Sequence, residues 1–132
     1  MKIKFRQWQN DHMKYFHIGP NRTDNIDKII AAPTMLGFEY YMGHGYGDVI
    51  IYEDDIVKFS YESPLMGLKG EYIGIIERDD YYFSVIIPDK GQRFAVDEPG
   101  LDVVEIIGHC YNPKDYDMET GEVLLILEKE SN

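Results

Sequence analysis

Three short apolar runs between residues 51 and 89 carry the clearest hydrophobic pattern of the chain. In the first run, the odd-numbered residues from Asp55 to Tyr61 fall on one face and the even-numbered residues on the other. This period of two is that of a strand with one buried side. The second run (72–76) and the third (81–87) are rich in β-branched and aromatic side chains. The pattern predicts three core strands.

Two different connections join these runs. Residues 77–80, Glu-Arg-Asp-Asp, are few enough to close a hairpin, and the aspartates can accept backbone hydrogen bonds in the turn. Residues 62–70 contain Pro64, Gly67 and Gly70, which favour bends over a continued ladder. We therefore expect an antiparallel pair after the first strand and an exposed loop at 62–70.

The N-terminal section predicts a hairpin followed by a short helix. Ile3 and Phe5 alternate with Lys2, Lys4 and Arg6, as in a strand with one wet side, and residues 13–18 can return as its partner. Thr23 or Asp24 can then cap a two-turn helix that carries Ile26, Ile29 and Ile30 on one side and ends near Ala32, before Pro33.

Further strands are predicted on both sides of the core, at residues 35–42, 49–51, 94–96, 103–108 and 123–127. The last run, Val-Leu-Leu-Ile-Leu, is wholly apolar within an acidic tail. Because exposed apolar runs promote aggregation, this one is expected to be buried against the domain or against another subunit.

Length and composition indicate a globular β protein. The 132 residues, 44% of them hydrophobic, suffice for one small core. We divide the chain into an N-terminal hairpin and helix (1–47), a barrel core (48–114) and an acidic tail with an apolar strand (115–132). The single cysteine, Cys110, rules out an intrachain disulfide. The charged N-terminus is unlike a signal peptide, so a cytoplasmic location is expected.

The charge is unevenly distributed. Residues 1–96 carry 11 basic and 14 acidic residues, whereas residues 97–132 carry 2 basic and 10 acidic ones. Binding to phosphate groups depends on clustered Lys and Arg side chains. Direct binding of this acidic chain to nucleic acid or to a membrane surface is therefore not expected.

Three segments resemble the YopX-like family of phage and prophage proteins: MKIKFRQWQNDHMKYF, GYGDVIIYEDDIVKF and VVEIIGHCYNPKDY. Their order and spacing agree with that family over most of residues 1–114. The chain departs from the pattern at Asp54, where the family has Gly, and at His109, where it has Asn. The resemblance implies an SH3-like small β-barrel (roll) with an N-terminal extension, encoded by a phage or prophage. It brings no activity and no catalytic residues.

No set of residues forms a recognisable catalytic or metal site. Residues 53–55 with Asp48 could offer oxygen ligands, but neighbouring strand residues point to opposite faces. The four histidines and Cys110 lack zinc spacing, and His109 beside Cys110 lacks an orienting group. The glycine-rich loop 43–47 leads into a strand rather than a helix, so it is read as a connector and not a phosphate cradle. No cofactor and no metal are predicted.

The leading hypothesis is a non-enzymatic protein that binds an unidentified host or phage protein and associates with itself as a homo-oligomer. Aromatic and apolar side chains supply most of the energy of such interfaces. The candidate interface residues are Tyr81, Tyr82, Val123, Leu125 and Leu127. The alternative is an acidic nucleic-acid mimic that occupies a basic protein. An enzyme would rest only on His109, Cys110 and the carboxylates of residues 53–55.

Overall fold

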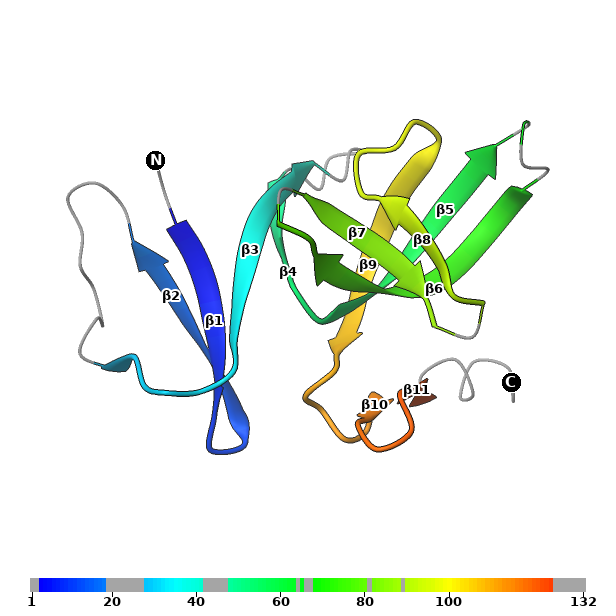
Figure 1. Ribbon diagram of the computed structural model, residues 1–132. Helices are drawn as coiled ribbons and strands as arrows, with labels where there is room; N and C mark the ends of the chain where they lie inside the picture. The colour runs from blue at the N-terminus through cyan, green and yellow to red at the C-terminus, as the bar shows by residue number, and fades with distance from the viewer. Residues whose placement is uncertain are drawn as a thin grey trace. The chain divides into compact units, whose positions relative to one another are not determined.

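The computed structural model describes residues 3–18, 28–41, 48–63, 65, 68–80, 82–88 and 90–124 (Figure 1). Every element that lies wholly within these residues is a strand, as the sequence predicts for a mainly β chain. The contacts group the chain into two units, residues 1–53 and 54–132, and each is described by itself. Within the described ranges, no helix has the length and apolar character needed to cross a membrane.

The first unit is a four-stranded antiparallel sheet in the order β2-β1-β3-β4. Its strands are β1 (Ile3–Gln9), β2 (His12–Ile18), β3 (Thr34–Tyr41) and β4 (Asp48–Tyr52). The first part of β3 pairs with β1 and its second part with β4. The expected strands at 35–42 and 49–51 are thereby confirmed.

The predicted N-terminal hairpin is also confirmed. Strands β1 and β2 pair along their whole length, and Phe5 stacks on Phe16 with ring centroids 4.8 Å apart. The turn between them places Asn10 at φ 48° and Asp11 at φ 71°. Such left-handed conformations suit the turns of tight hairpins, and Asn and Asp tolerate them better than other residues with a side chain.

The prediction that Arg6 faces water is wrong, because its side chain is only 2% exposed. Its guanidinium donates from Nε to Met35 Sδ (3.3 Å) and from Nη2 to the Glu53 carbonyl oxygen (3.0 Å). It also lies 4.9 Å from the centroid of the Tyr52 ring, within the range of a cation–π interaction. Alternation along β1 shows which residues share a face, but not that Met35 on β3 and Tyr52 on β4 contact Arg6 on its expected solvent side.

The short helix expected to end near Ala32 is absent from residues 29–32, and its predicted start lies outside the described residues. Glutamine side chains form hydrogen bonds with the main-chain groups that would bond to each other within a helix. The Gln7 amide donates to the Ile30 carbonyl (2.9 Å) and accepts from the Ile30 N–H (3.2 Å). Gln9 Nε2 donates to the Lys28 carbonyl (3.1 Å) and to Gln7 Oε1 (2.7 Å). The segment is thus held against β1 as a non-helical chain.

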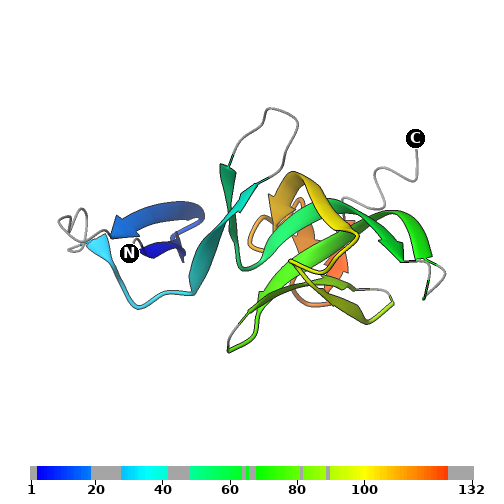
Figure 2. The ribbon, with the colours of Figure 1, turned by 90° about the horizontal axis from the view of Figure 1, so that it is seen from above.

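The second unit contains a five-stranded antiparallel sheet in the order β8-β7-β6-β5-β9, which curls into a half-barrel (Figures 1 and 2). Its strands are β5 (Asp55–Ser63), β6 (Leu68–Arg78), β7 (Phe83–Ile87), β8 (Gln92–Ala95) and β9 (Leu101–His109). A small hairpin of β10 (Tyr116–Asp117) and β11 (Glu122–Val123) follows. The three core strands expected between residues 51 and 89 are confirmed, together with those near 94–96 and 103–108.

The inner face of the half-barrel holds the side chains that the alternation of the first run predicts. Val57 and Phe59 are fully buried, and Tyr61 packs against Phe94 with ring centroids 4.5 Å apart. Two register shifts between β5 and β9 mark bulges, which bend a strand and increase its local twist. Bending at these points allows the sheet to curl around its apolar face.

The opposite face is also covered at one end, which the sequence pattern does not predict. There Ile56, Ile75, Cys110 and Val123 form a second buried cluster. Because Val123 comes from β11, the start of the C-terminal run lies in the core of this unit. The predicted burial of that run against its own domain is confirmed at Val123; residues 125–127 lie outside the described part of the chain.

The loop expected at residues 62–70 is shorter than predicted. The β5–β6 ladder continues to the pair Ser63 and Leu68, and Gly70 pairs with Tyr61. Glycine disfavours a strand through its entropy and its missing side chain, but it keeps its N–H and can still take part in a ladder. The β6–β7 turn falls at residues 79–82 rather than 77–80, and the Asp79 N–H donates to the Tyr82 carbonyl (2.8 Å).

The boundaries of the units differ from the expected division at 47/48 and 114/115. Strand β4 pairs with β3, so it belongs to the first unit, while β11 contributes to the core of the second. The first residue of the second unit, Asp54, has φ 67°. Its N–H donates to the Ile76 carbonyl (2.8 Å), and its carbonyl accepts from the Cys110 N–H (2.9 Å). Asp54 therefore has the left-handed conformation that a glycine in this position would adopt without strain.

We expect Asp54→Gly and Asp54→Asn to leave the free energy of unfolding within about 0.5 kcal/mol of the parent. Asp54→Val should lower it by about 1 to 2 kcal/mol, because a β-branched side chain is strained at positive φ. Urea denaturation followed by circular dichroism measures these differences. Asp97→Val is the control, since Asp97 is exposed and has no positive φ. Equal losses in the two valine variants would contradict a conformational cause.

Candidate functional site

A hollow of about 380 Å³ lies where the chain leaves β9 and forms the β10–β11 hairpin. Five apolar or aromatic side chains make up most of its lining, with two carboxylates and the thiol of Cys110 completing it. The lining residues are Cys110, Tyr111, Pro113, Tyr116, Asp117, Met118, Glu119 and Leu124. All of them belong to the second unit, and Figure 1 shows this hairpin beyond the end of β9.

Turn hydrogen bonds shape the first wall of the hollow. The Asn112 carbonyl accepts from the N–H groups of Asp115 (2.9 Å) and Tyr116 (3.1 Å). The Asn112 side chain accepts from the Lys114 N–H (3.0 Å), so one asparagine holds the whole Asn-Pro-Lys-Asp turn. The Leu124 N–H donates to the Asp115 carbonyl (2.9 Å) and closes the hairpin on the other side. The walls are thus fixed by the main chain.

The Asp117 carboxylate is held in place at the edge of the hollow. Its Oδ1 accepts from the N–H groups of Glu119 (2.9 Å) and Thr120 (3.3 Å), and its main-chain carbonyl accepts from Gly121 (2.7 Å). An aspartate that accepts backbone hydrogen bonds in a turn has little freedom to rotate. The hollow therefore has a negative charge at a defined position.

Tyr116 forms the floor where the hollow meets the second core cluster. Burial raises the pKa of its phenol, and nearby negative charges raise this pKa further, among them Asp54, Glu77 and Asp117. Both causes disfavour a phenolate. The same carboxylates that oppose a negative phenolate favour a cation at this place.

These pKa shifts predict a loss of stability in alkaline solution. Burial also raises the pKa of Tyr61, and a hydrogen bond with Glu98 adds to the increase. Above about pH 10 the unfolded chain loses tyrosine protons that the folded chain keeps, so the free energy of unfolding falls as pH rises. Urea unfolding at pH 8 to 11 measures the slope. The double variant Tyr61→Phe, Tyr116→Phe should show a shallower slope, and an unchanged slope would contradict the assignment.

The structure places the predicted interface residues in different settings. Tyr82 is 49% exposed, as an interface residue requires. Val123 is only 4% exposed and packs inside its own unit, which leaves little of its side chain to contact another subunit. Tyr81, Leu125 and Leu127 lie outside the described residues.

The carboxylates at residues 53–55 belong to two different units and have different surroundings. Glu53 Oε1 accepts from the Leu36 N–H (3.0 Å) in the first unit, whereas Asp54 and Asp55 belong to the second. Asp55 is buried at the start of β5. The side chain of Asp48 and the loop at 43–47 fall outside the described part. Across the residues that are described, no three His, Cys, Asp or Glu side chains gather as metal ligands would.

The side chains of His109 and Cys110 have different surroundings. His109 Nδ1 accepts from the Tyr111 N–H (3.2 Å), so this nitrogen cannot also take a proton from a thiol. Cys110 is buried with Ile56 and Val123.

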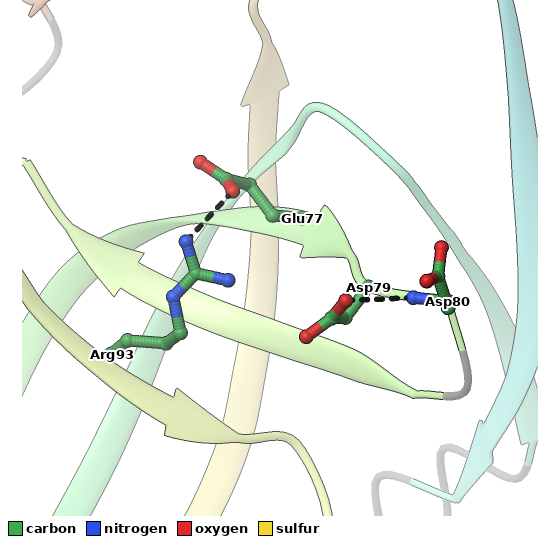
Figure 3. A network of polar contacts seen from close by, with 4 residues as sticks. All are labelled: Glu77, Asp79, Asp80 and Arg93. Atoms are coloured by element: carbon green, nitrogen blue, oxygen red, sulfur yellow. Dashed lines mark hydrogen bonds and ion pairs between the residues drawn. The ribbon is translucent and has the colours of Figure 1, made fainter.

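A second, shallower hollow of about 600 Å³ lies beside β8 and the turn that follows, lined by residues 93–95 and 97–99. Arg93 at its edge donates to Glu77 on β6 (3.2 Å), and near the same end of β6 Asp79 accepts from the Asp80 N–H (2.8 Å) (Figure 3). Such an exposed ion pair contributes little to stability. Because this hollow holds charges of both signs, it offers less selectivity for a charged ligand than the first.

Apart from Cys110, the residues that line the first hollow could not be recognised from the sequence. Most of them come from turns, which show no periodicity, and the segment Asn-Pro-Lys-Asp-Tyr-Asp, which contributes three of them, is typical of connecting segments. The one signal available is the density of turn-forming aspartates beside Tyr111, Tyr116 and Met118. Comparison of the chain with protein-family models, with curated proteins and with solved structures found no match in any of the three.

Proposed function

We propose that this chain is a non-enzymatic accessory protein of a phage or prophage that binds a protein partner in the host cytoplasm and associates with itself. The surface of the second unit carries the proposal. Val104 and Ile106 on β9 are 40% and 37% exposed, and they lie within a segment that is strongly acidic. Apolar side chains surrounded by charged ones are typical of protein–protein interfaces.

The strand order supports an SH3-like small barrel for the second unit. Four consecutive strands, β5 to β8, form a meander, and β9 returns to pair with β5. An SH3-like barrel has this arrangement of five strands. The conformation of Asp54 adds to the resemblance with YopX-like proteins, since a glycine at this place in that family would adopt positive φ without strain.

The proposed interface can be tested by capture from the lysate of phage-infected cells. The parent chain is expected to retain a defined set of proteins, and Val104→Ser with Ile106→Ser should release most of them. Leu65→Ser is the matched control, because Leu65 is fully exposed in the same unit and lies on the β5–β6 connection. Light scattering on the same samples reports self-association. Retention that is identical for both variants and the parent would contradict this interface.

The charge of the same segment favours a second candidate function, in which the chain mimics a nucleic acid and occupies a basic protein. Residues 97–124 hold a single basic residue, Lys114. Their acidic residues are Asp97, Glu98, Asp102, Glu105, Asp115, Asp117, Glu119 and Glu122. A basic partner held in this way should be released when salt is raised from 0.05 to about 0.5 M, because salt screens exposed charges. Capture that does not change with salt would contradict mimicry.

A further inference from the structure

The hollow beside Tyr116 combines two properties that point to one kind of ligand. Its walls are largely apolar, with Tyr111, Pro113, Met118 and Leu124 among them, so they can cover a hydrocarbon chain. Its volume of about 380 Å³ is at the small end of the roughly 300–1,000 Å³ typical of ligand pockets. This size suits one long side chain rather than a nucleotide or a folded segment.

The charged residues that line the hollow are of one sign in the described part of the chain. They are Asp117 and Glu119, and no lysine or arginine among the described residues lines it. Glu119 is exposed at the rim, whereas Asp117 is fixed by its turn hydrogen bonds. A cation here would meet a carboxylate already in position, and the tyrosine rings offer faces to which cations are attracted.

We propose that this hollow binds the basic side chain, arginine or lysine, of a protein partner. The aliphatic stem lies along Pro113, Met118 and Leu124, and the cationic head lies between the tyrosine rings and the Asp117 carboxylate. Long basic side chains commonly bury their stems in this way while the charge stays near water. The inference rests on the proposed protein-binding function and names the chemistry that the partner must present.

Burial is the main cause of the raised pKa of Tyr116, but the nearby negative charges that add to it support this assignment, because they also favour a cation beside the ring. Asp54 and Glu77 add to that negative surrounding although they do not line the hollow. A bare metal ion fits less well, since no three ligating side chains of the described residues gather there. A side chain with its own hydrocarbon stem uses both the apolar walls and the charge.

The probe is a Gly/Ser peptide of eleven residues with one central arginine, and the matched peptide carries citrulline, which has the same shape without the charge. Each is titrated into the full chain at low salt, and the Met118 methyl and Tyr116 ring signals are followed by NMR. The arginine peptide is expected to shift these signals to saturation, and the citrulline peptide to bind at least about tenfold more weakly.

Asp117→Asn is the decisive variant, because asparagine Oδ1 can accept the same N–H bonds from Glu119 and Thr120 and preserve the turn. It should weaken the arginine peptide about three- to tenfold. Glu122→Gln removes one charge from an exposed residue of β11 that does not line the hollow, and should change the affinity less than about twofold. Equal losses in the two variants would show general attraction to an acidic surface and overturn the site.

A chain ending at Leu124 tests whether residues 125–132, rather than a side chain of a partner, occupy the hollow. Binding of the arginine peptide to this shortened chain alone would overturn the proposal in favour of the protein's own tail. The outcome is separable from that of the capture experiment, which uses Val104 and Ile106. If Asp117→Asn leaves peptide binding unchanged while those two side chains still control capture, the pocket fails and the protein-binding function stands.

Discussion

Gly100→Ala is expected to lower the free energy of unfolding of the second unit by about 3 kcal/mol. Gly100 has φ +89°, a conformation that costs a residue with a side chain roughly 1 to 2 kcal/mol. A Cβ at this position would also run into the carbonyl oxygen of Glu62. The backbone cannot simply move away, because the Glu62 N–H donates to the Gly100 carbonyl (3.1 Å). Forced contacts of this kind add about 1 to 3 kcal/mol.

Gly91→Ala separates these two costs. Gly91 also has a positive φ of +65°, but nothing lies within 4 Å of its added Cβ. It should therefore lose only the conformational part, about 1 kcal/mol. Urea denaturation followed by tyrosine near-ultraviolet dichroism gives the two values, and hydrogen exchange of the Phe59 amide localises the loss to the inner core. Similar losses in both variants would show that the approach to Glu62 is unimportant.

A chain that ends at Lys114 is expected to lose at least about 3 kcal/mol, because it removes Val123 from the second core cluster. Burying one valine contributes about 1.5 kcal/mol or more. Its removal also uncovers Ile56, which is fully buried, and Ile75 on the next strand. Tyr116, which packs against the same cluster, is lost with it.

The matched control is the chain that ends at Leu124, which keeps β10, β11 and every described residue of the hollow. Its free energy of unfolding should remain within about 1 kcal/mol of that of the full chain. Denaturation gives the stabilities, and light scattering gives the mass. If the chain ending at Lys114 is as stable as the parent but forms a smaller oligomer, Val123 would instead be assigned to an interface between subunits.

The strands of the second unit could be predicted because their periodicity is local. Residues 57–61 alternate strictly between apolar and polar side chains, and Val57 and Phe59 are buried as that alternation requires. Ile56 could not be recognised as buried from the same pattern, since the segment that covers it lies more than fifty residues later in the chain. A periodicity identifies the two faces of a strand, but it does not reveal what covers the second.

The errors in the first unit have the same origin. The spacing of Ile26, Ile29 and Ile30 favours a helix only while main-chain groups have no other partner, and Gln7 supplies one for Ile30. The sequence pattern predicts a solvent-exposed Arg6 because a guanidinium is rarely buried unless it is paired. Its partners, Met35 and Tyr52, come from strands that pair only in the folded unit.

The candidate site could be predicted least. Its aromatic and acidic residues are ordinary turn residues in the sequence, and only the bonds of Asn112 and Asp117 bring them around one hollow. By contrast, Asp54, one of the two positions at which the sequence departs from the YopX-like pattern that it resembles, has the positive φ that a glycine in its place would adopt without strain. A backbone requirement of this kind can be inferred from a single substitution. A cavity can be recognised only when the positions of all the residues around it are known.

The two hydrogen bonds between the Gln7 side chain and the Ile30 main chain imply that this contact does not depend on which side chain residue 30 carries. One amide contacts both main-chain groups of Ile30, whose own side chain is 46% exposed. The segment after residue 28 can therefore change its side chains over evolutionary time without losing this attachment to β1. Proline at position 30 is the exception, since it has no N–H to offer Gln7. Gln7, rather than the segment that it holds, is where sequence change should be most constrained.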